Sequence, residues 1–390
     1  MVKLLLLGAC FVFSIAGAVV GEPIIVGTGS ALELPARYYR PGGEGPFPAV
    51  VVLHGSGGLW ANDIPNGAMV RHFEEWAQLF AEEGYASLFV DSYTPRGLVE
   101  FRSRRPSDDP AIDDSICSPA YERPKDAYKA LAFLQARPEI RADRIGLLGF
   151  SQGAETALSS LVSSSISKTN WTMSALKLNG ETETRSFPAP VRLASPPGFA
   201  VAIVYYPGCG FYGYFGSSSG TSSNLFMPYA PTLMFHGSDD PLYSGNLYPE
   251  AFTQKSAAQA AAIGLPFNPL QAVVYPGAAH SFDEADLAGP ESPNLSAKRM
   301  SRELALAWFS AYLKEPQLKI TFREGGGVSL IWNRGKGIRH RILSGNEPSA
   351  PSNPLFETTA SATLEDQEYQ LESGEPRQFF RLENVLPAPF

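Results

Sequence analysis

The chain has 390 residues, of which 44% are hydrophobic and 12% aromatic, so it can bury a large core. Its length is typical of about two domains. The net charge of −8 and the isoelectric point near 5.3 argue against a nucleic-acid partner. The sequence has no internal repeat and no long run of like charges.

The first residues, 1–21, have the pattern of a secretory signal peptide. A lysine precedes a long apolar run that ends at Val20, and the small residues up to Ala18 are typical of a cleavage site. We expect cleavage after Ala18 or Gly21 and a secreted or periplasmic protein. Two alternatives stay open: a lipoprotein signal at Cys10, which the continuing apolar run disfavours, and an uncleaved anchor, for which the run is slightly short.

Between residues 22 and 315, apolar stretches of strand length alternate with helical patterns. This alternation predicts parallel strands joined by right-handed helical crossovers. The expected strands lie near 23–28, 32–39, 47–54, 86–91, 144–149, 199–206, 231–236 and 270–275. The expected helices are 66–83, 124–137, 152–164, 249–263 and 296–314. We therefore expect an α/β domain over 22–315, with a mostly parallel sheet flanked by helices.

The most informative motif is Gly149-Phe-Ser-Gln-Gly153, which lies between an apolar strand and a small-residue helix. The glycines permit a strained turn that lifts the hydroxyl of Ser151 clear of the sheet, so the pattern predicts a nucleophile elbow. A serine nucleophile needs a base that is itself held by an acid. Asp240 and His280 each follow a predicted strand, and parallel strands collect their carboxyl ends at one edge.

The acid and the base are selected from few candidates. Asp240 is preferred to Asp239 because Pro241 holds it in extended backbone, and Asp91 is a weaker substitute. The chain has five histidines: His54, His72, His236, His280 and His340. The pattern around His72 favours a solvated or half-buried helical position, His236 a turn and His340 the surface, so His280 is the predicted base.

The glycine-rich turn His54-Gly-Ser-Gly-Gly58 follows a predicted strand. Glycines there let backbone amides point at a developing oxyanion. The expected donors are the amide of Gln152 and that of Ser56 or Gly57. A turn without a ligand is the alternative, which the rest of the triad disfavours.

These segments resemble the α/β-hydrolases of the dienelactone hydrolase type over roughly residues 25–315. The resemblance rests on His54-Gly-Ser-Gly-Gly, Asp91-Ser-Tyr-Thr-Pro-Arg-Gly, Gly149-Phe-Ser-Gln-Gly, Tyr206-Pro-Gly-Cys, His236-Gly-Ser-Asp-Asp-Pro and Gly277-Ala-Ala-His-Ser-Phe. It implies the α/β-hydrolase fold with an eight-stranded type of sheet, no metal, no organic cofactor, and hydrolysis of carboxylic esters or lactones. The name-giving enzymes use a cysteine nucleophile, so Ser151 favours general ester hydrolysis.

Two insertions, about 165–197 and 210–229, emerge near the elbow or the strand ends. The second combines aromatic residues with glycine and serine, which suits a hydrophobic or sugar-linked acyl substrate, although a disordered surface loop is equally compatible. Trp60, Arg96 and Tyr206 are candidate substrate-binding residues. For Arg96, a structural ion pair within the Asp91 loop is an open alternative.

Export also makes Cys117 and Cys209 candidates for a disulfide that pins two loops beside the pocket. Two buried free thiols are the alternative, and neither cysteine has the spacing of a zinc ligand.

Residues 316–390 predict a separate, small β-sandwich-like domain. Short alternating strands are expected at 318–322, 327–332, 339–343, 369–372 and 379–382, separated by turn residues. The segment weakly resembles C-terminal β-modules of exported bacterial proteins, so it is expected to contact a glycan or the cell surface. Trp332 is interpreted as a core residue.

Taken together, the sequence predicts an exported serine hydrolase that cleaves small-molecule or carbohydrate-linked esters through an acyl-enzyme. A non-catalytic glycan-binding or surface protein on the same scaffold is the alternative from another class. A peptidase or thioesterase with the same triad is the closer rival.

Overall fold

The structure is a computed structural model. It describes residues 21–98, 117–119, 122–161, 170–176, 182–188, 198–207, 228–242, 249–262, 264 and 269–314, and six strands beyond residue 314. For the strands within 170–188 and beyond 314, only the backbone is described. Apart from Gly21, the predicted signal segment lies outside the described residues, as does Cys209.

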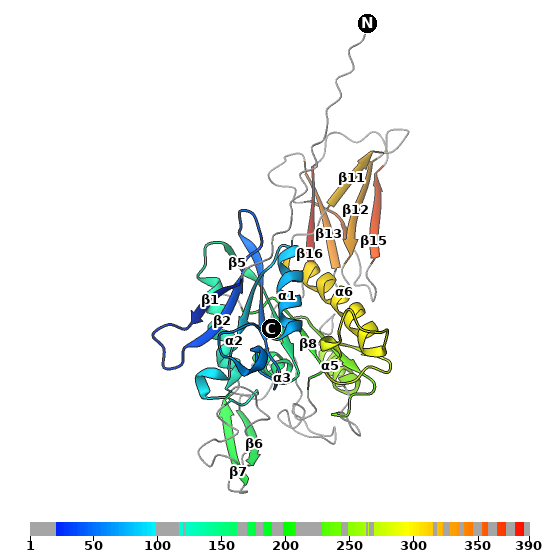
Figure 1. Ribbon diagram of the computed structural model, residues 1–390. Coiled ribbons are helices and arrows are strands. Elements are labelled where there is room, and N and C mark those ends of the chain that lie inside the picture. The colour runs from blue at the N-terminus through cyan, green and yellow to red at the C-terminus, as the bar shows by residue number, and fades with distance from the viewer. Residues whose placement is uncertain are drawn as a thin grey trace.

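A central eight-stranded sheet forms the body of the molecule (Figure 1). Its strands, in spatial order, are β1 (Glu22–Val26), β2 (Leu34–Tyr39), β4 (Ala86–Val90), β3 (Phe47–Leu53), β5 (Ile140–Phe150), β8 (Val201–Tyr205), β9 (Thr232–Gly237) and β10 (Leu270–Tyr275). The pairs β1–β2 and β2–β4 are antiparallel, and the remaining pairs are parallel. The expected α/β-hydrolase fold with a mostly parallel sheet is therefore confirmed.

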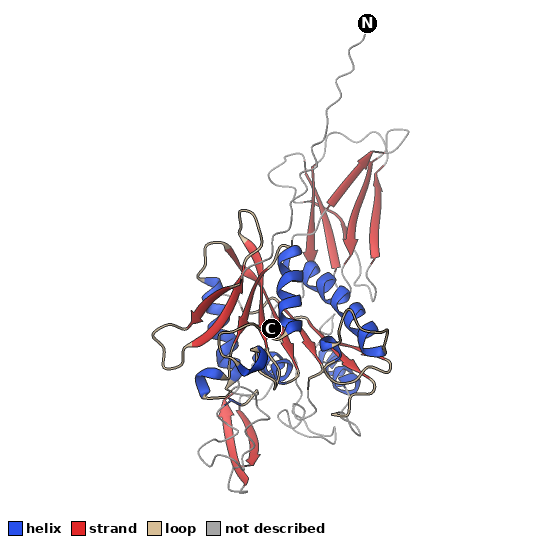
Figure 2. Ribbon diagram, viewed as in Figure 1, coloured by secondary structure: helices blue, strands red, loops and turns tan. Residues whose placement is uncertain are grey.

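Helices cover both faces of this sheet (Figure 2). The helices are α1 (Arg71–Glu82), α2 (Arg123–Gln135), α3 (Gln152–Ser160), α5 (Pro249–Ala262) and α6 (Pro293–Leu313). Successive side chains of a strand point to opposite faces. Val51 and Leu53 accordingly pack with α2 and α3, whereas Val50 and Val52 pack with α1 and α6. Because β3 is buried on both faces, its sequence is a continuous apolar run rather than an alternating one.

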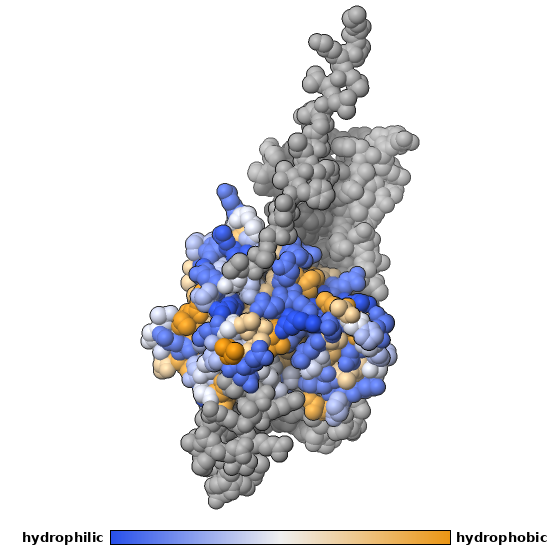
Figure 3. Space-filling view, in the orientation of Figure 1, coloured by the Kyte–Doolittle hydropathy of each residue, from blue (hydrophilic) through white to orange (hydrophobic). Residues whose placement is uncertain are grey.

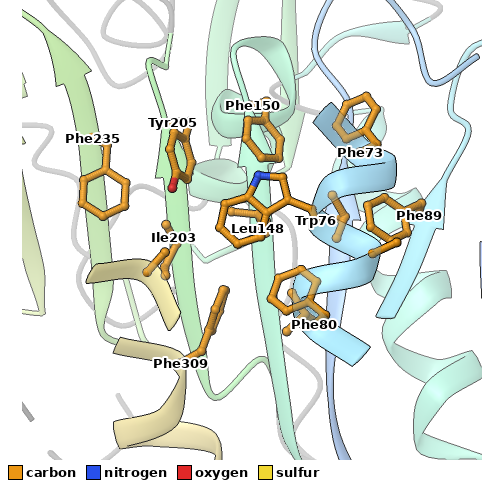
Figure 4. Packing of buried hydrophobic residues seen from close by; sticks show 14 of the residues in the cluster. Phe73, Trp76, Phe80, Phe89, Leu148, Phe150, Ile203, Tyr205, Phe235 and Phe309 are labelled. Atoms are coloured by element: carbon orange, nitrogen blue, oxygen red, sulfur yellow. The ribbon is translucent and has the colours of Figure 1, made fainter. Parts of the chain in front are cut away.

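The layer between the sheet and helices α1 and α6 is rich in aromatic side chains (Figure 4). Trp76 lies at its centre, with ring centroids of Phe80 and Phe150 5.2 and 6.2 Å away. Phe150 also stacks on Tyr205 at 5.0 Å. Buried aromatic pairs of this kind add about 0.5–1.5 kcal/mol each beyond the burial of their area. The end of β5, directly before Ser151, is thus held in a well-packed environment.

Helix α1 begins at Arg71, later than the predicted start at residue 66. Asn66 has a left-handed backbone, with φ of 62°, which ends any helical run there. Met69, expected on the helix, instead forms an isolated antiparallel bridge with Trp60. The loop between these two residues therefore closes on itself before the helix starts.

The first insertion contains an antiparallel hairpin that was not predicted, made of β6 (Asn170–Leu176) and β7 (Thr182–Pro188). Figure 1 shows it extending from the body of the sheet domain. The remainder of that insertion and residues 208–227 of the second lie outside the described residues.

Beyond residue 314, the described strands form two three-stranded antiparallel sheets. One contains β11 (Leu318–Phe322), β12 (Val328–Arg334) and β15 (Glu365–Leu371), and the other β14 (Asn353–Glu357), β13 (Arg339–Gly345) and β16 (Phe379–Val385). Strand β14 was not predicted. It contains Pro354, which a strand tolerates at the edge of a sheet, and β14 lies at the edge of its sheet. The division at residue 315 stays a prediction.

Hydrophilic residues predominate on the face shown in Figure 3. The large hydrophobic side chains that are exposed in the described part of the chain are Ile25, Ile64, Leu242, Leu287 and Met300. Scattered apolar residues of this kind are normal on a protein surface. None of the helices that the structure describes is long and apolar enough to cross a bilayer.

His72 is buried, with 6% of its surface exposed, which corrects the prediction of a solvated or half-buried position. Its ring contacts Phe73 and Phe150, with centroids 3.8 and 5.4 Å away. Neither ring nitrogen has a hydrogen-bond partner among the described residues. Burial lowers the pKa of His72 from 6.5 to about 3, because the charged imidazolium loses its hydration.

This burial predicts acid sensitivity. His72 is neutral in the folded protein, whereas below pH 6.5 the unfolded chain takes up the proton. Its contribution to the free energy of unfolding is therefore present above pH 6.5 and is lost as the pH falls toward 3, by up to about 1.4 kcal/mol per pH unit. Urea titrations of the wild type and His72→Phe at pH 7.5, 6 and 5 test this. We expect the free energy of unfolding of the wild type to fall relative to that of His72→Phe as the pH is lowered. Parallel curves would assign the acid sensitivity to other groups, such as the buried His54.

Candidate active site

Ser151 lies on the turn between β5 and α3 with φ of 50° and ψ of −116°, a backbone conformation that residues other than glycine seldom adopt. The two flanking glycines are required by close packing. A Cβ on Gly149 would lie 2.2 Å from the carbonyl oxygen of Gly153, and one on Gly153 would lie 2.2 Å from the carbonyl oxygen of Leu53. The amide of Ser151 donates to the carbonyl of Tyr205 at 2.9 Å. The turn is thus the sharp strand-to-helix elbow that the motif predicts.

His280 and Asp240 lie in line with this serine. The His280 Nε2 atom is 3.0 Å from the hydroxyl oxygen of Ser151, and its Nδ1 atom is 2.7 Å from Oδ2 of Asp240. Asp240 is 4% exposed. Its other carboxylate oxygen accepts the amide of Leu242 at 2.9 Å. In this arrangement an imidazole can accept the serine proton on one nitrogen while the carboxylate holds the other.

The two rival acids are elsewhere. Asp239 is exposed and accepts the hydroxyl of Ser238 at 2.8 Å. Asp91 is buried, where its carboxylate accepts the amides of Tyr93 and Thr94. The structure therefore brings Asp240, and neither of the others, into contact with His280.

The loop that carries His280 is anchored by buried charges that the sequence reasoning missed. Asp283 is fully buried and accepts two bonds from the guanidinium of Arg302, at 2.7 and 3.0 Å. It also accepts the indole N–H of Trp76 at 2.9 Å. These groups tie the loop to α6 and α1. Removing one partner from a buried pair typically costs about 3–5 kcal/mol, because the other charge is left unpaired.

One predicted oxyanion donor, Gln152, directly follows Ser151, and the turn that carries the others packs beside the elbow. Gln152 is the first residue of α3, where amides have no acceptor within the helix. Gly55 packs beside the elbow, since a Cβ there would lie 3.2 Å from the Cβ of Ser151. The amides of Ser56 and Gly57 follow directly and, like that of Gln152, have no recorded acceptor among the described residues.

His54 shapes this turn from within. It is fully buried, its Nε2 atom accepts the amide of Ser92 at 3.1 Å, and Nδ1 is 2.8 Å from the carbonyl of Gly55. Burial, reinforced by the nearby Arg123, lowers the pKa of His54 well below its usual value. A neutral ring with Nδ1 protonated satisfies both contacts.

The three predicted substrate-binding residues have structural contacts instead. Trp60 is 4% exposed and donates its indole N–H to Asp91 at 2.6 Å. Arg96 pairs with Asp126 through two bonds of 2.8 and 3.0 Å, so its guanidinium is in an ion pair, although the partner lies on α2 and not within the Asp91 loop as the alternative had it. Tyr206, 1% exposed, packs edge-on against His280 with ring centroids 4.8 Å apart. The Tyr206 side chain is therefore buried against the imidazole.

Cys117 is a free and buried thiol in the structure, so the predicted disulfide with Cys209 is not formed there. Its sulfur lies 3.6 Å from the carbonyl of Ser92 and packs with Tyr93 and Leu98. Burial raises the pKa of Cys117 to about 11, which makes the thiolate needed for exchange scarce.

No group of three or more histidine, cysteine or acidic side chains in the described part of the chain is arranged to hold a metal ion.

Residues 34–170 match the model of the dienelactone hydrolase family. A putative dienelactone hydrolase from Klebsiella pneumoniae is similar in structure, with 18% identity and a TM-score of 0.49 over 76% of this chain and 100% of that chain. A dienelactone hydrolase-like promiscuous phosphotriesterase from metagenomic libraries has 19% identity and a TM-score of 0.44 over 76% and 99%. A thermophilic esterase from Thermogutta terrifontis has 18% identity and a TM-score of 0.44 over 75% and 94%. No curated protein matches this sequence.

Proposed function

We propose that the α/β domain of this chain belongs to the dienelactone hydrolase family, whose model matches residues 34–170, and that the protein is a serine hydrolase of carboxylic esters. The observation that carries the proposal is the continuous row from Asp240 through His280 to Ser151, with contacts of 2.7 and 3.0 Å.

In the proposed reaction, Nε2 of His280 takes the proton of Ser151 while the serine oxygen attacks the ester carbonyl. The amides of Gln152 and of Ser56 or Gly57 stabilise the negative charge that develops on the carbonyl oxygen. His280 then passes the proton to the leaving alkoxide, and an acyl group remains on Ser151. Asp240 stabilises the imidazolium and fixes which nitrogen carries the proton. A water molecule, deprotonated by His280, releases the acid.

We also propose that the protein is exported, with residues 1–21 removed, and that its C-terminal strands contact a glycan or the cell surface. The apolar N-terminus followed by small residues supports export. Determining the N-terminal sequence of the protein from the extracellular or periplasmic fraction tests it. A chain that begins at Met1 and stays in the cytoplasm would contradict it.

A substrate panel tests the proposed reaction. The intact protein is offered short-chain nitrophenyl esters, the matching thioesters and the matching anilides, and is separately treated with a fluorophosphonate that labels activated serines. We expect ester hydrolysis and a single labelled peptide that contains Ser151. Faster turnover of thioesters or anilides would favour the thioesterase or peptidase alternative. No turnover and no labelling would leave the non-catalytic alternative.

A further inference from the structure

Arg123 carries a second buried charge near the site, besides the Asp283–Arg302 pair. No step of the proposed reaction uses it. Its side chain is fully buried at the start of α2. It donates from Nη2 to the carbonyl oxygen of His54 at 2.6 Å. The Nε and Nη1 atoms have no hydrogen-bond partner among the described residues. Burying a guanidinium with so few acceptors costs folding free energy. The bond to the His54 carbonyl is therefore a candidate for a role in the site.

The bond fixes the turn that carries one side of the oxyanion hole. The carbonyl of His54 belongs to the peptide that leads into Gly55, and the next amides are those of Ser56 and Gly57. Because a peptide unit is planar, holding the His54 oxygen also sets the direction of the Gly55 amide and the course of the turn. The short bond to Arg123 comes from α2, a different element from the strand that leads into the turn.

The other side of the oxyanion hole is connected to the same guanidinium through Tyr93. The guanidinium lies 5.2 Å from the centre of the Tyr93 ring, in a cation–π contact. The ring of Tyr93 also meets that of His54 edge-on at 4.4 Å. Its hydroxyl donates to the side-chain oxygen of Gln152 at 2.6 Å. Arg123 thus contacts both the His54 turn directly and the Gln152 side through one aromatic ring.

Two buried carboxylates in this region, Asp126 and Asp91, are bound by groups other than Arg123. Asp126, one turn further along α2, is bound by Arg96 through two bonds. Asp91 is bound by Trp60 and by backbone amides. A fixed positive charge in a buried position stabilises negative charge that appears nearby during the reaction, and it does so without reorganisation.

We propose that Arg123 is a positioning residue for the oxyanion hole, acting on the Ser56 side through the His54 carbonyl and on the Gln152 side through Tyr93. This inference rests on the proposed function, since it assigns a role within the same ester hydrolysis. Arg123 aligns the two donors and favours the tetrahedral intermediate over the bound ester. Its loss should therefore lower kcat and leave KM nearly unchanged.

Three variants test the inference: Arg123→Met, Arg123→Lys and Tyr93→Phe. Arg123→Met removes the charge and the bond, and we expect kcat for a nitrophenyl ester to fall about 10- to 100-fold, less than or equal to the loss of a whole oxyanion donor. The kcat of Arg123→Lys should lie between that of Arg123→Met and that of the wild type. Tyr93→Phe keeps the ring but removes the bond to Gln152, and a loss of about 3- to 10-fold is expected.

A trifluoromethyl ketone supplies the decisive readout, because it forms a tetrahedral adduct on Ser151 whose oxyanion occupies the same hole. Its inhibition constant should rise by the same factor as kcat falls, while KM changes less than about threefold. Arg137→Met is the matched control, since that guanidinium stacks on Tyr38 with its carbon 4.4 Å from the ring centre and bonds Glu139 away from the site. It should leave both constants unchanged.

The outcomes separate the inference from the proposed function. A wild type that neither hydrolyses esters nor binds the ketone overturns the proposed function. An active wild type with unchanged kcat and inhibition constants in the folded Arg123 variants overturns the inference, as does a change confined to KM. If Arg123→Met does not fold, Arg123→Lys and Tyr93→Phe decide by the same two constants.

Discussion

Replacing Ser151 with alanine is expected to lower kcat for nitrophenyl esters by about 10⁵-fold or more, since triad nucleophiles have effects of that order. The hydroxyl oxygen lies 3.0 Å from His280, and without it no acyl-enzyme can form. The residual rate would come from water activated by His280 at the intact oxyanion hole. Fluorophosphonate labelling should disappear in the same variant, which intact-protein mass spectrometry measures directly.

The matched control is Ser296→Ala, which removes a half-buried hydroxyl from α6. It should retain the wild-type rate and labelling. The thermal midpoint of Ser151→Ala should also stay close to that of the wild type, because alanine takes over the same strained backbone at φ of 50°. Wild-type turnover in Ser151→Ala would contradict the proposed nucleophile, and a large loss in Ser296→Ala would show that the assay reports folding.

The proximity of Ser151, Asp240 and His280 could be predicted because each follows one of the parallel strands of the sheet. β5, β8, β9 and β10 are consecutive in the sheet and parallel, so their carboxyl ends meet at one edge. Local chemistry then decided between neighbours. The choice of Asp240 over Asp239 rested on Pro241, and the structure places the preferred carboxylate on His280.

The side-chain partners of the other candidates could not be predicted, because they come from distant parts of the chain. Asp126, which occupies Arg96, lies 30 residues further on. Trp76 and Asp283, which anchor the His280 loop, are separated by 207 positions. Periodicity and motif spacing carry no information about such contacts, so an arginine near a strand end is equally compatible with substrate binding and with a buried pair.

Arg123 illustrates the same limit. In the sequence it is one charged residue before a proline at the start of a helix, a position that usually faces solvent. Its contact with the His54 carbonyl depends on where α2 packs relative to the His54 turn. That position is set by the tertiary packing of the sheet and helices. Asp126 follows at helical spacing, but such a pair is typical of a solvent-exposed helix face, so the spacing could not have identified Arg123 as buried.

Replacing Asp240 with asparagine is expected to lower kcat about 10⁴-fold, the loss typical of this change in a serine triad. The Oδ2 atom of Asp240 is 2.7 Å from Nδ1 of His280, so the carboxylate requires the proton on Nδ1 and leaves Nε2 free to accept from Ser151. An asparagine can turn its NH₂ group toward Nδ1, which moves the proton to Nε2. His280 would then have no lone pair directed at the serine.

Asp239→Asn is the matched control, since it makes the same change one residue earlier. That side chain is exposed, and its recorded side-chain bond is with the hydroxyl of Ser238, so kcat should remain within about twofold of the wild type, as for most surface positions away from such sites. Fluorophosphonate labelling of Asp240→Asn should slow in parallel with kcat, because both reactions need the same activated hydroxyl. Equal losses in the two variants would mean that negative charge on this loop matters in general. A loss in Asp239→Asn alone would move the acid to the neighbouring position.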